Sequence, residues 1–244
     1  MIFLVIAQFI NSWLTLIQKY KNMNILIVGA DENYQEAKEK LTAHQLTHVE
    51  GLSEITEKNF FEAELVFDFI SQETPESLHF YEQKPDLVVF LNTVMTSFLD
   101  LFVFIEPIKN TVFGFNGLPT FFNRPILEAT LSDTENKEML LSLVKKLEWD
   151  VEIVDDRVAM ATPRIITMII NEAYYTVQEG TATKEDIDQG MKLGTNYPHG
   201  PFEWCEKIGI ENVFEVLNSI YEDTKEERYK ICPLLKKEYL KTIA

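Results

Sequence analysis

The stretch Thr183-Lys-Glu-Asp-Ile-Asp-Gln-Gly-Met-Lys-Leu-Gly-Thr-Asn-Tyr-Pro-His-Gly-Pro-Phe202 contains the clearest structural signals in the chain. Thr183 is followed three residues later by Asp186, which resembles a capping box with Asp in place of Glu, so a helix should begin here. Gly194 is expected to end that helix. Gly200-Pro201 then places a proline where the first turn of a helix tolerates it. The stretch therefore predicts two consecutive helices joined by a short turn.

Apolar helical patterns lie on both sides of this stretch. Residues 165–170 are apolar on nearly every side of a helix, which indicates burial between neighbouring elements, and Gly180 follows as a stop signal. Between Ile210 and Tyr221, apolar residues recur at spacings of 3, 4 and 7, as on one face of a helix. We therefore predict an all-α domain over residues 157–244.

The preceding part of the chain has a different periodicity. Short apolar runs alternate with polar helical segments, as expected for buried parallel strands with crossover helices. The runs that we interpret as strands are 24–28, 47–50, 65–70, 87–91, 111–115 and 151–154. Ser132 begins a capping-box pattern for a helix that should end near Glu148. We predict an α/β domain over residues 23–156, with a reduced Rossmann-like parallel sheet.

Residues 1–22 form an apolar extension ahead of Met23. The extension has no basic residue before Lys19 and no small-residue cleavage site, so a secretory signal is not expected. Polar residues interrupt the apolar run, which is also short for a membrane span of about 20 residues. An over-long translated start or an accessory helix fits best, and a peripheral membrane anchor is the alternative.

Composition excludes several classes of function. The chain has 244 residues, and its 46% hydrophobic content is sufficient for a real core. A net charge of −17, from 39 acidic and 22 basic residues, would repel a phosphate backbone, so nucleic-acid binding is not expected. Cys205 and Cys232 form no motif for a disulfide framework or a zinc site. We predict no metal, and a reducing cytoplasmic location.

Five short segments occur in the order and spacing of the C-terminal domain of 3-hydroxyacyl-CoA dehydrogenases. They are Glu172-Ala173, Glu179-Gly180, Lys184–Asp188, Met191–Gly194 and Tyr197–Glu203. The chain resembles that family, whose members oxidise a 3-hydroxyacyl-CoA to a 3-ketoacyl-CoA with NAD. In the family this domain forms the dimer interface and one wall of the substrate cleft, so the resemblance implies a homodimer and an acyl-CoA substrate. The glycines and prolines of these segments specify packing, so they indicate ancestry better than activity.

The nucleotide site of this family requires glycines at the first strand-to-helix turn, because the backbone must approach the pyrophosphate closely. In this chain the turn is Gly29-Ala-Asp-Glu-Asn-Tyr34, so only Gly29 is retained. Asp31 and Glu32 would face the pyrophosphate, although acids also suit the start of a helix without any ligand. Glu50 holds the position of the acid that binds the ribose of NAD. Cofactor binding by Gly29 and Glu50 stays open.

Family members use a His general base that is oriented by a Glu twelve residues later. An ungapped match through Gly114-Phe115 places Asn116 at the position of the His and Glu128 at that of the Glu. A match through Thr120–Asn123 instead places Thr120 at the position of the base. Neither match provides a histidine, and an amide cannot take up a proton, so conventional hydride transfer should be severely slowed.

Arg164 is retained from an Asn-Arg pair of the family, which reads Pro163-Arg164 in this chain. It could bind a phosphate or carboxylate of a substrate, or else form a surface ion pair with Asp155 or Asp156. Two hypotheses follow. One is a dehydrogenase impaired by loss of its base, and the other is a non-catalytic dimeric binding or regulatory relative that no longer uses NAD. A different activity centred on Glu128 and Arg164 has no spacing that defines a reaction.

Overall fold

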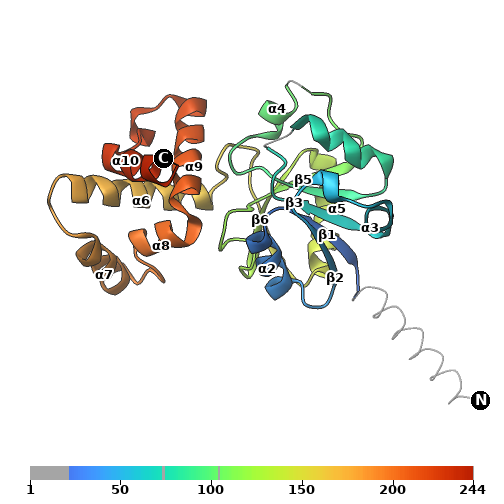
Figure 1. Cartoon of the computed structure of the whole chain (residues 1–244), viewed down its shortest axis with the longest axis horizontal. Helices are drawn as coiled ribbons and strands as arrows, with labels where there is room; N and C mark the ends of the chain where they lie inside the picture. Colours follow the sequence, from blue (N-terminus) through green and yellow to red (C-terminus); the bar gives the residue numbers. More distant parts are fainter. Residues whose placement is uncertain (1–21, 73–74, 104, 244) are drawn as a thin grey trace, which may run out of the picture.

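The chain consists of a sheet-containing part followed by a helical part, and the two lie side by side (Figure 1). The computed structural model describes residues 22–72, 75–103 and 105–243. Apart from Asn22, the apolar extension of residues 1–22 lies outside the described residues. Within the described ranges, no helix has both the length and the apolar character that crossing a membrane requires.

One sheet of seven strands forms the centre of the first part, in the order β2-β1-β3-β4-β5-β6-β7. The strands are β1 (Asn24–Val28), β2 (Gln45–Val49), β3 (Leu65–Asp68), β4 (Val88–Asn92), β5 (Thr111–Phe115), β6 (Ile126–Leu131) and β7 (Asp150–Ile153). Neighbouring strands are parallel except β5 and β6, which are antiparallel. The expected Rossmann-like α/β fold is confirmed, but the sheet is mixed rather than wholly parallel.

Strand β6 is the element that the sequence pattern did not predict. It carries Glu128 and Thr130 among its apolar residues, so it lacks the continuous apolar run of the other central strands. Both polar side chains are nevertheless buried, at 8% and 2% exposure. The chain returns from β5 to β6 through residues 116–125 without a crossover helix, and such a direct return pairs two strands in antiparallel orientation.

The predicted cap at Ser132 is wrong. Its hydroxyl donates to the carbonyl of Val112 at 2.7 Å and so fastens the end of β6 to β5. Asp133 instead caps a short 3-10 turn, η3 (Thr134–Asn136), by accepting from the backbone N–H of Glu135 at 2.9 Å. Helix α5 (Lys137–Lys146) follows directly from that turn.

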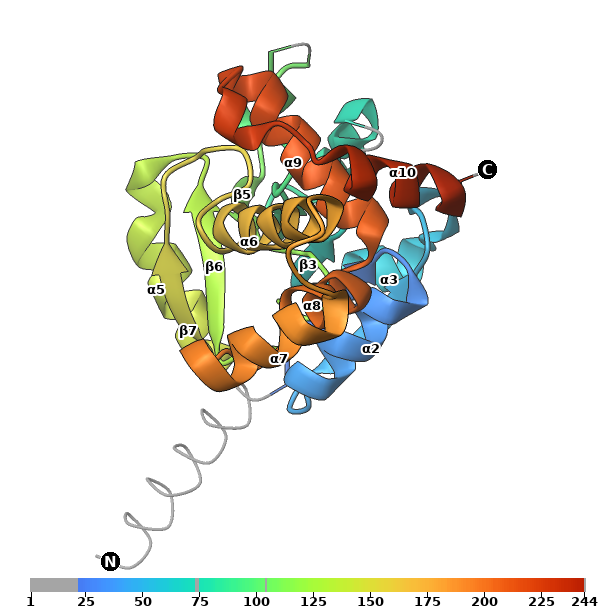
Figure 2. The ribbon, with the colours of Figure 1, turned by 90° about the vertical axis from the view of Figure 1, so that its left-hand side faces the viewer.

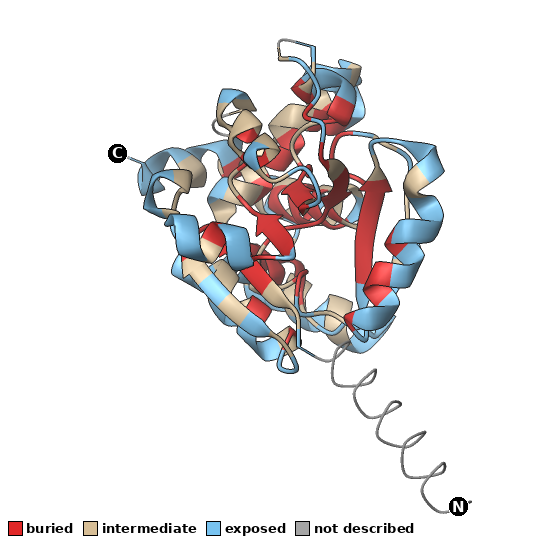
Figure 3. Cartoon of the chain, turned by 90° about the vertical axis from the view of Figure 1, so that its right-hand side faces the viewer, coloured by how far each residue is buried: buried red, intermediate tan, exposed pale blue. Residues whose placement is uncertain are grey.

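Helices cover both faces of the sheet, so the buried strands lie inside a layer of more exposed helices (Figure 3). One face packs on α2 (Asp31–Lys40) and α5 through Ala37, Leu140 and Val144. The other face packs on α3 (Glu57–Glu62), η2 (Pro75–Gln83) and α4 (Phe98–Leu101). A strand that is covered on both faces can be apolar at every position, which is why β1, β3, β4 and β5 read as continuous apolar runs.

The second part is helical, as predicted. Its helices are α6 (Thr162–Gln178), α7 (Lys184–Thr195), α8 (Pro201–Ile208), α9 (Ile210–Thr224) and α10 (Pro233–Thr242). Figure 2 shows α6 in the middle of this part, with α9 and α10 on one side and α7 and α8 on the other. Burial of α6 is less complete than its sequence predicted, because Ile165 is 59% exposed.

In the stretch from Thr183 to Phe202, α7 is capped by its own first residues and α8 is capped by a residue of α7. The Thr183 hydroxyl accepts from the Asp186 N–H at 3.1 Å, so the predicted helix start is confirmed. The Asp188 carboxylate then accepts from the N–H groups of Phe202 at 2.8 Å and Glu203 at 3.1 Å, so a residue of α7 caps α8. Gly200 permits this approach, because a Cβ at that position would lie 2.3 Å from Asp188 Cγ. These contacts bear out the expectation that the stretch specifies packing.

Candidate active site

The structure brings Asn116 and Glu128 together. Asn116 directly follows β5, and antiparallel pairing with β6 places Glu128 beside it, with the Asn116 N–H donating to the Glu128 carbonyl at 3.0 Å. The Asn116 side-chain amide also donates to Glu128 Oε2 at 3.1 Å. Both side chains are buried, at 2% and 8% exposure. The ungapped match therefore describes a real pair of neighbours.

The second oxygen of Glu128 binds the start of helix α6. Oε1 accepts from the N–H groups of Ala161 at 2.7 Å and Thr162 at 2.9 Å. The N-terminus of a helix carries partial positive charge, which favours a carboxylate at this position. Glu128 thus accepts three hydrogen bonds and ties the sheet to the helical part. Asn116 offers the pair an amide donor and no group that can take up a proton.

Thr120, the alternative base position, is held by a different element. Its backbone N–H donates to the carboxylate of Glu36 on α2. Thr120 has a φ of 72°, which is a strained value for a β-branched residue. Its hydroxyl oxygen is buried without a hydrogen-bond partner among the described residues. These contacts do not connect Thr120 to Glu128.

The turn at Gly29 is packed against the chain itself. Gly29 has a φ of 153°, and a Cβ there would lie 2.9 Å from both Asn33 Oδ1 and Phe69 Cβ. The space next to the Gly29 backbone is therefore filled by the Asn33 side chain and by Phe69, which directly follows β3. The carbonyl of Gly29 lies 2.8 Å from His48 Nε2, and the His48 ring stacks on Tyr34 at 4.7 Å. This aromatic stack was not predicted, although Tyr34 in place of a glycine was its visible signal.

Aromatic rings pack together next to the carboxyl ends of β3 and β5. In doubly wound sheets ligands bind at the switch point, which here lies between β1 and β3. Here Phe69 is 5% exposed, and its ring centroid lies 5.0 Å from that of Phe115 and 5.1 Å from that of Phe122. Phe122 itself is fully buried. Phe69, Phe115 and Phe122 belong to one buried core cluster of the sheet.

The acidic residues around the turn do not complete a nucleotide site. Asp31 and Glu32 lie in the first turn of α2, but Ala30 is the N-cap and no side chain caps the helix. Glu50 is exposed beside the turn, where the Gly29 N–H donates to the Val49 carbonyl at 3.0 Å. Asp31 and Glu32 are exposed, and Tyr34 holds the third glycine position, so the turn lacks two of the three glycines that bring a backbone close to a pyrophosphate.

Arg164 has structural partners within the helical part and its linker. One terminal nitrogen donates to the Tyr229 hydroxyl at 3.0 Å, and the other donates to the Val158 carbonyl at 2.6 Å. The ion pair with Asp155 or Asp156 that we had considered is not among these contacts. Asp156 instead accepts from the Phe98 N–H at 2.9 Å, and burial raises the pKa of its carboxyl group.

A cleft of about 600 Å³ lies between the loops that follow β3 and β4 and helix α9. Its charged lining residues are all acidic, namely Glu76, Asp100 and Glu215. Such a lining disfavours a polyanion such as coenzyme A. Within the part of the chain that the structure describes, no cluster of His, Cys, Asp and Glu suitable for a metal ion occurs.

Solved structures share this arrangement of a sheet followed by helices. FadB2 of Mycobacterium tuberculosis gives a TM-score of 0.70 at 18% identity and covers 89% of this chain and 93% of its own. The (S)-3-hydroxybutyryl-CoA dehydrogenase PaaH1 of Ralstonia eutropha gives 0.68 at 18% identity and covers 91% and 94%. At this identity the likeness concerns the fold alone, which is the two-part fold of dehydrogenases.

Sequence comparison then identifies the family. Residues 160–241 match the family described as 3-hydroxyacyl-CoA dehydrogenase, C-terminal domain. The 3-hydroxybutyryl-CoA dehydrogenase of Bradyrhizobium diazoefficiens is 33% identical over 122 residues, 50% of this chain and 42% of that enzyme. The 3-hydroxyadipyl-CoA dehydrogenase of Escherichia coli is 39% identical over 87 residues, 36% and 18% of the two chains. Residues 160–241 belong to the family of 3-hydroxyacyl-CoA dehydrogenase C-terminal domains. The matched stretch spans less than half the length of these relatives.

Proposed function

We propose that this chain descends from an NAD-dependent enzyme that oxidised a 3-hydroxyacyl-CoA to a 3-ketoacyl-CoA, and that it performs this reaction at a severely reduced rate. One observation carries the proposal. The position of the general base holds Asn116, whose amide donates to Glu128 at 3.1 Å inside a buried pair. Oxidation of an alcohol requires a group that accepts the hydroxyl proton, and an amide does not supply one.

The remaining groups of the pair do not replace the base. Glu128 is an acceptor by chemistry, but its two side-chain oxygens already bind the Asn116 amide and the N–H groups of Ala161 and Thr162. A substrate hydroxyl would have to displace one of these donors to reach the carboxylate. Glu128 therefore positions its neighbours, and the chain keeps the orienting half of a catalytic pair without the proton acceptor.

Restoring the base tests this proposal. Asn116→His should raise a trace rate of acetoacetyl-CoA reduction with NADH by about tenfold or more, because general acid–base catalysis contributes at least that much. Thr120→His is the matched control, since it places the imidazole at the alternative position of the base. An equal gain in both variants, or none in Asn116→His protein that binds both ligands, would contradict the role that we assign to Asn116.

A second candidate is a non-catalytic binding or regulatory relative that no longer uses NAD. The packing of Phe69 against Gly29 favours it, because a Cβ at Gly29 would lie 2.9 Å from Phe69 Cβ, so the chain itself uses part of the close approach that a pyrophosphate needs. NADH titration, followed by nicotinamide fluorescence and calorimetry, separates the candidates. Binding at micromolar concentration would rule out the non-binding alternative, and absence of binding at millimolar concentration would rule out any dehydrogenase activity. Glu50→Ala provides a check, since it should weaken binding only if NAD occupies the family position.

We also propose that the chain forms a homodimer through its helical part and works in the cytoplasm. Helix α7 contains no buried residue, although Ile187, Met191 and Leu193 are apolar. Leu193 is 78% exposed, and Ile187 and Met191 are only partly buried, so α7 carries apolar side chains that a second copy of the chain could cover. Cys205 and Cys232 are free and buried, which suits a reducing compartment. The acyl-CoA class of substrate rests on descent, and the acidic cleft predicts weak binding of coenzyme A.

A further inference from the structure

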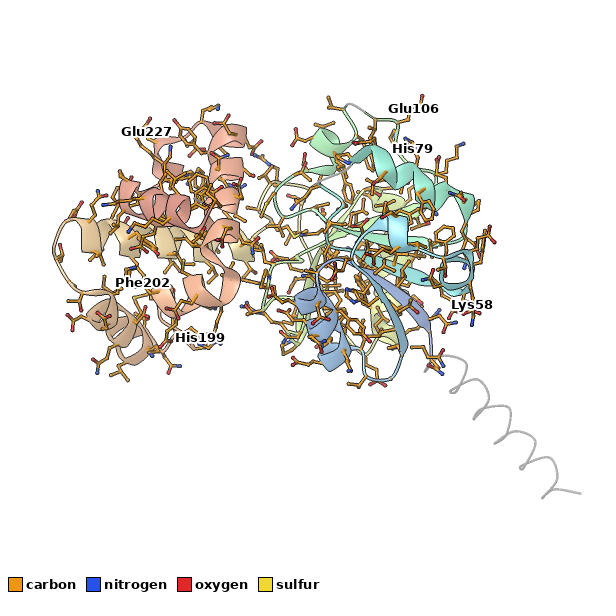
Figure 4. The ribbon with its side chains drawn as sticks, viewed as in Figure 1. Lys58, His79, Glu106, His199, Phe202 and Glu227 are labelled. Carbon is orange, nitrogen blue, oxygen red and sulfur yellow. The ribbon has the colours of Figure 1, made fainter. Side chains whose placement is uncertain are left out.

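A pocket between the two parts of the molecule has the chemistry of an anion site. It measures about 490 Å³ and lies between the loop that joins β5 to β6 and the segment from Pro198 to Lys207. Figure 4 labels His199 on this segment, just before α8. We propose that the pocket binds a phosphate group, as inorganic phosphate or a small phosphate monoester. The residues that line it are Thr120, Asn123, Arg124, Pro198, His199, Trp204 and Lys207.

Arg124 is the principal recognition group, because its guanidinium is oriented and yet unpaired. Its Nε donates to the Thr120 carbonyl at 2.8 Å, and its guanidinium carbon lies 3.7 Å from the centre of the Phe121 ring. These two contacts fix the plane of the group. Among the described residues, Arg124 forms no ion pair, and its terminal nitrogens make no hydrogen bond. A planar fork held in this way suits two oxygens of one anion.

The charge of the lining is basic in a chain whose net charge is −17. Lys207 lines the same pocket as Arg124, and no acidic residue lines it. The carboxylates nearby are engaged elsewhere, since Glu36 accepts from the Thr120 N–H and Glu39 accepts from the Asn123 amide at 3.1 Å.

Two further acids near the lining are also engaged. Glu128 binds Asn116 and the start of α6, and Glu203 pairs with Lys192 and lies 4.0 Å from His199 Nδ1. Among the described residues Arg124 and Lys207 therefore form no ion pair, although the charges of Glu128 and Glu36 act on Arg124.

Thr120 supplies an independent observation. Its hydroxyl oxygen is buried without a partner among the described residues, which is unfavourable unless a ligand or water provides one. Its backbone is also strained, with a φ of 72°. Strain of this kind persists where the surrounding structure holds a residue for a purpose, and binding sites are the usual place. A phosphate oxygen accepting from this hydroxyl would satisfy it.

Among the positions matched to the family's catalytic and nucleotide sites, only Thr120, the alternative base position, lines the pocket. None of Gly29, Glu50, Asn116 and Glu128 lines it. Because its two walls come from the sheet-containing and the helical parts, a bound phosphate would bridge them. Binding to the folded state raises its stability in proportion to the logarithm of ligand concentration, so phosphate should stabilise both parts together.

Calorimetric titration of the full chain with inorganic phosphate, at ionic strength held constant with chloride, tests the proposal. We expect saturable binding that Arg124→Met and Lys207→Gln each weaken at least tenfold. Met keeps an apolar stem over Phe121, and Lys207 is exposed, so the second variant should fold even if the first does not. Arg228→Gln is the matched control. Arg228 lies outside the pocket, so this variant should bind phosphate with the affinity of the original chain.

Three results would overturn the proposal. The first is a heat of titration no larger than that of chloride alone. The second is equal affinity in the original chain and Lys207→Gln. The third is stronger binding of acetate than of phosphate, which would show that the pocket selects carboxylates.

Discussion

Glu128 is the residue on which most of the site depends. Three donors converge on its carboxylate, namely the Asn116 amide and the N–H groups of Ala161 and Thr162. A buried donor that loses its partner is expensive, so removal of this one side chain affects β5, β6 and α6 together.

Glu128→Ala should therefore lower the free energy of unfolding by about 3 kcal/mol, because unsatisfied buried donors cost about 1–3 kcal/mol each and water replaces part of the loss. Urea denaturation followed by circular dichroism measures the change. Glu128→Gln is the control, since its amide oxygen can still accept and its loss should be smaller. If both variants lose the same free energy of unfolding, the loss of the acceptor oxygens is not the cause of the destabilisation.

The resemblance to the family placed Asn116 and Glu128 as a pair, with Thr120 as the alternative, and the antiparallel return from β5 to β6 brings Asn116 and Glu128 together. The partners of Arg164 could not be found in this way. Tyr229 lies 65 residues further along the chain, and the Val158 carbonyl is a backbone group with no sequence signature. Unpaired Arg124 escaped notice for a related reason, since its pocket forms only when the helical part packs against the loop.

At the scale of elements, two glycines near α7 and α8 should respond oppositely to replacement by alanine. Gly200→Ala places a Cβ 2.3 Å from Asp188 Cγ and should displace the cap of α8, at a cost of about 1–2 kcal/mol, the usual range for a lost cap. Gly190→Ala is the matched control, because a Cβ in this helical position meets nothing within 4 Å, and it should stabilise by about 0.5–1 kcal/mol. Thermal denaturation of both variants measures the difference, and shifts of the same sign would be inconsistent with this account.

The contact between α2 and the β5–β6 loop should depend on pH through Glu36. Burial raises the pKa of its carboxyl group, although backbone N–H groups of Thr120, Asn123 and Phe122 oppose the shift. For an acid whose folded pKa is raised, the contribution to stability is complete below the unfolded value of about 4.3 and is lost as pH rises through the folded value.

The stability of the original chain minus that of Glu36→Gln should consequently fall as pH rises from about 4. Urea denaturation at a series of pH values measures this difference. Glu32→Gln removes an exposed carboxylate of the same helix and controls for general charge effects. If this difference in stability instead rises with pH, the N–H donors lower the pKa of Glu36 by more than burial raises it.

Sequence patterns predicted the buried strands and the helices well, because both faces of the central strands are covered and the helical stripe of α9 is regular. They did not predict β6 or its antiparallel direction, nor the short helices α3 and α4. Glu128 and Thr130 give β6 the polarity of a loop, and their burial depends on partners that lie in β5 and α6. The cap at Ser132 failed similarly, since its hydroxyl is drawn to the Val112 carbonyl across the sheet.

For the whole molecule, the exposed face of α7 predicts self-association. Leu193→Glu should shift the chain from dimer toward monomer in sedimentation equilibrium, since it places a charge at the most exposed large apolar residue of the helix. Leu240→Glu, on α10 and 46% exposed, is the control for added charge on an apolar surface of the same helical part. A chain that is monomeric before any substitution, or a dimer that only Leu240→Glu weakens, would exclude α7 as the interface.

The double attachment of Glu128 also bears on how such a protein can change over evolutionary time. Because the same carboxylate caps the helix that leads out of the sheet, selection for folding alone is enough to keep it. Nothing comparable holds a histidine at position 116, where an amide donates to Glu128 equally well. If selection for the reaction is lost, mutation can therefore remove the base while Glu128 is retained. A retained glutamate at this position is then evidence for the fold and not for the reaction.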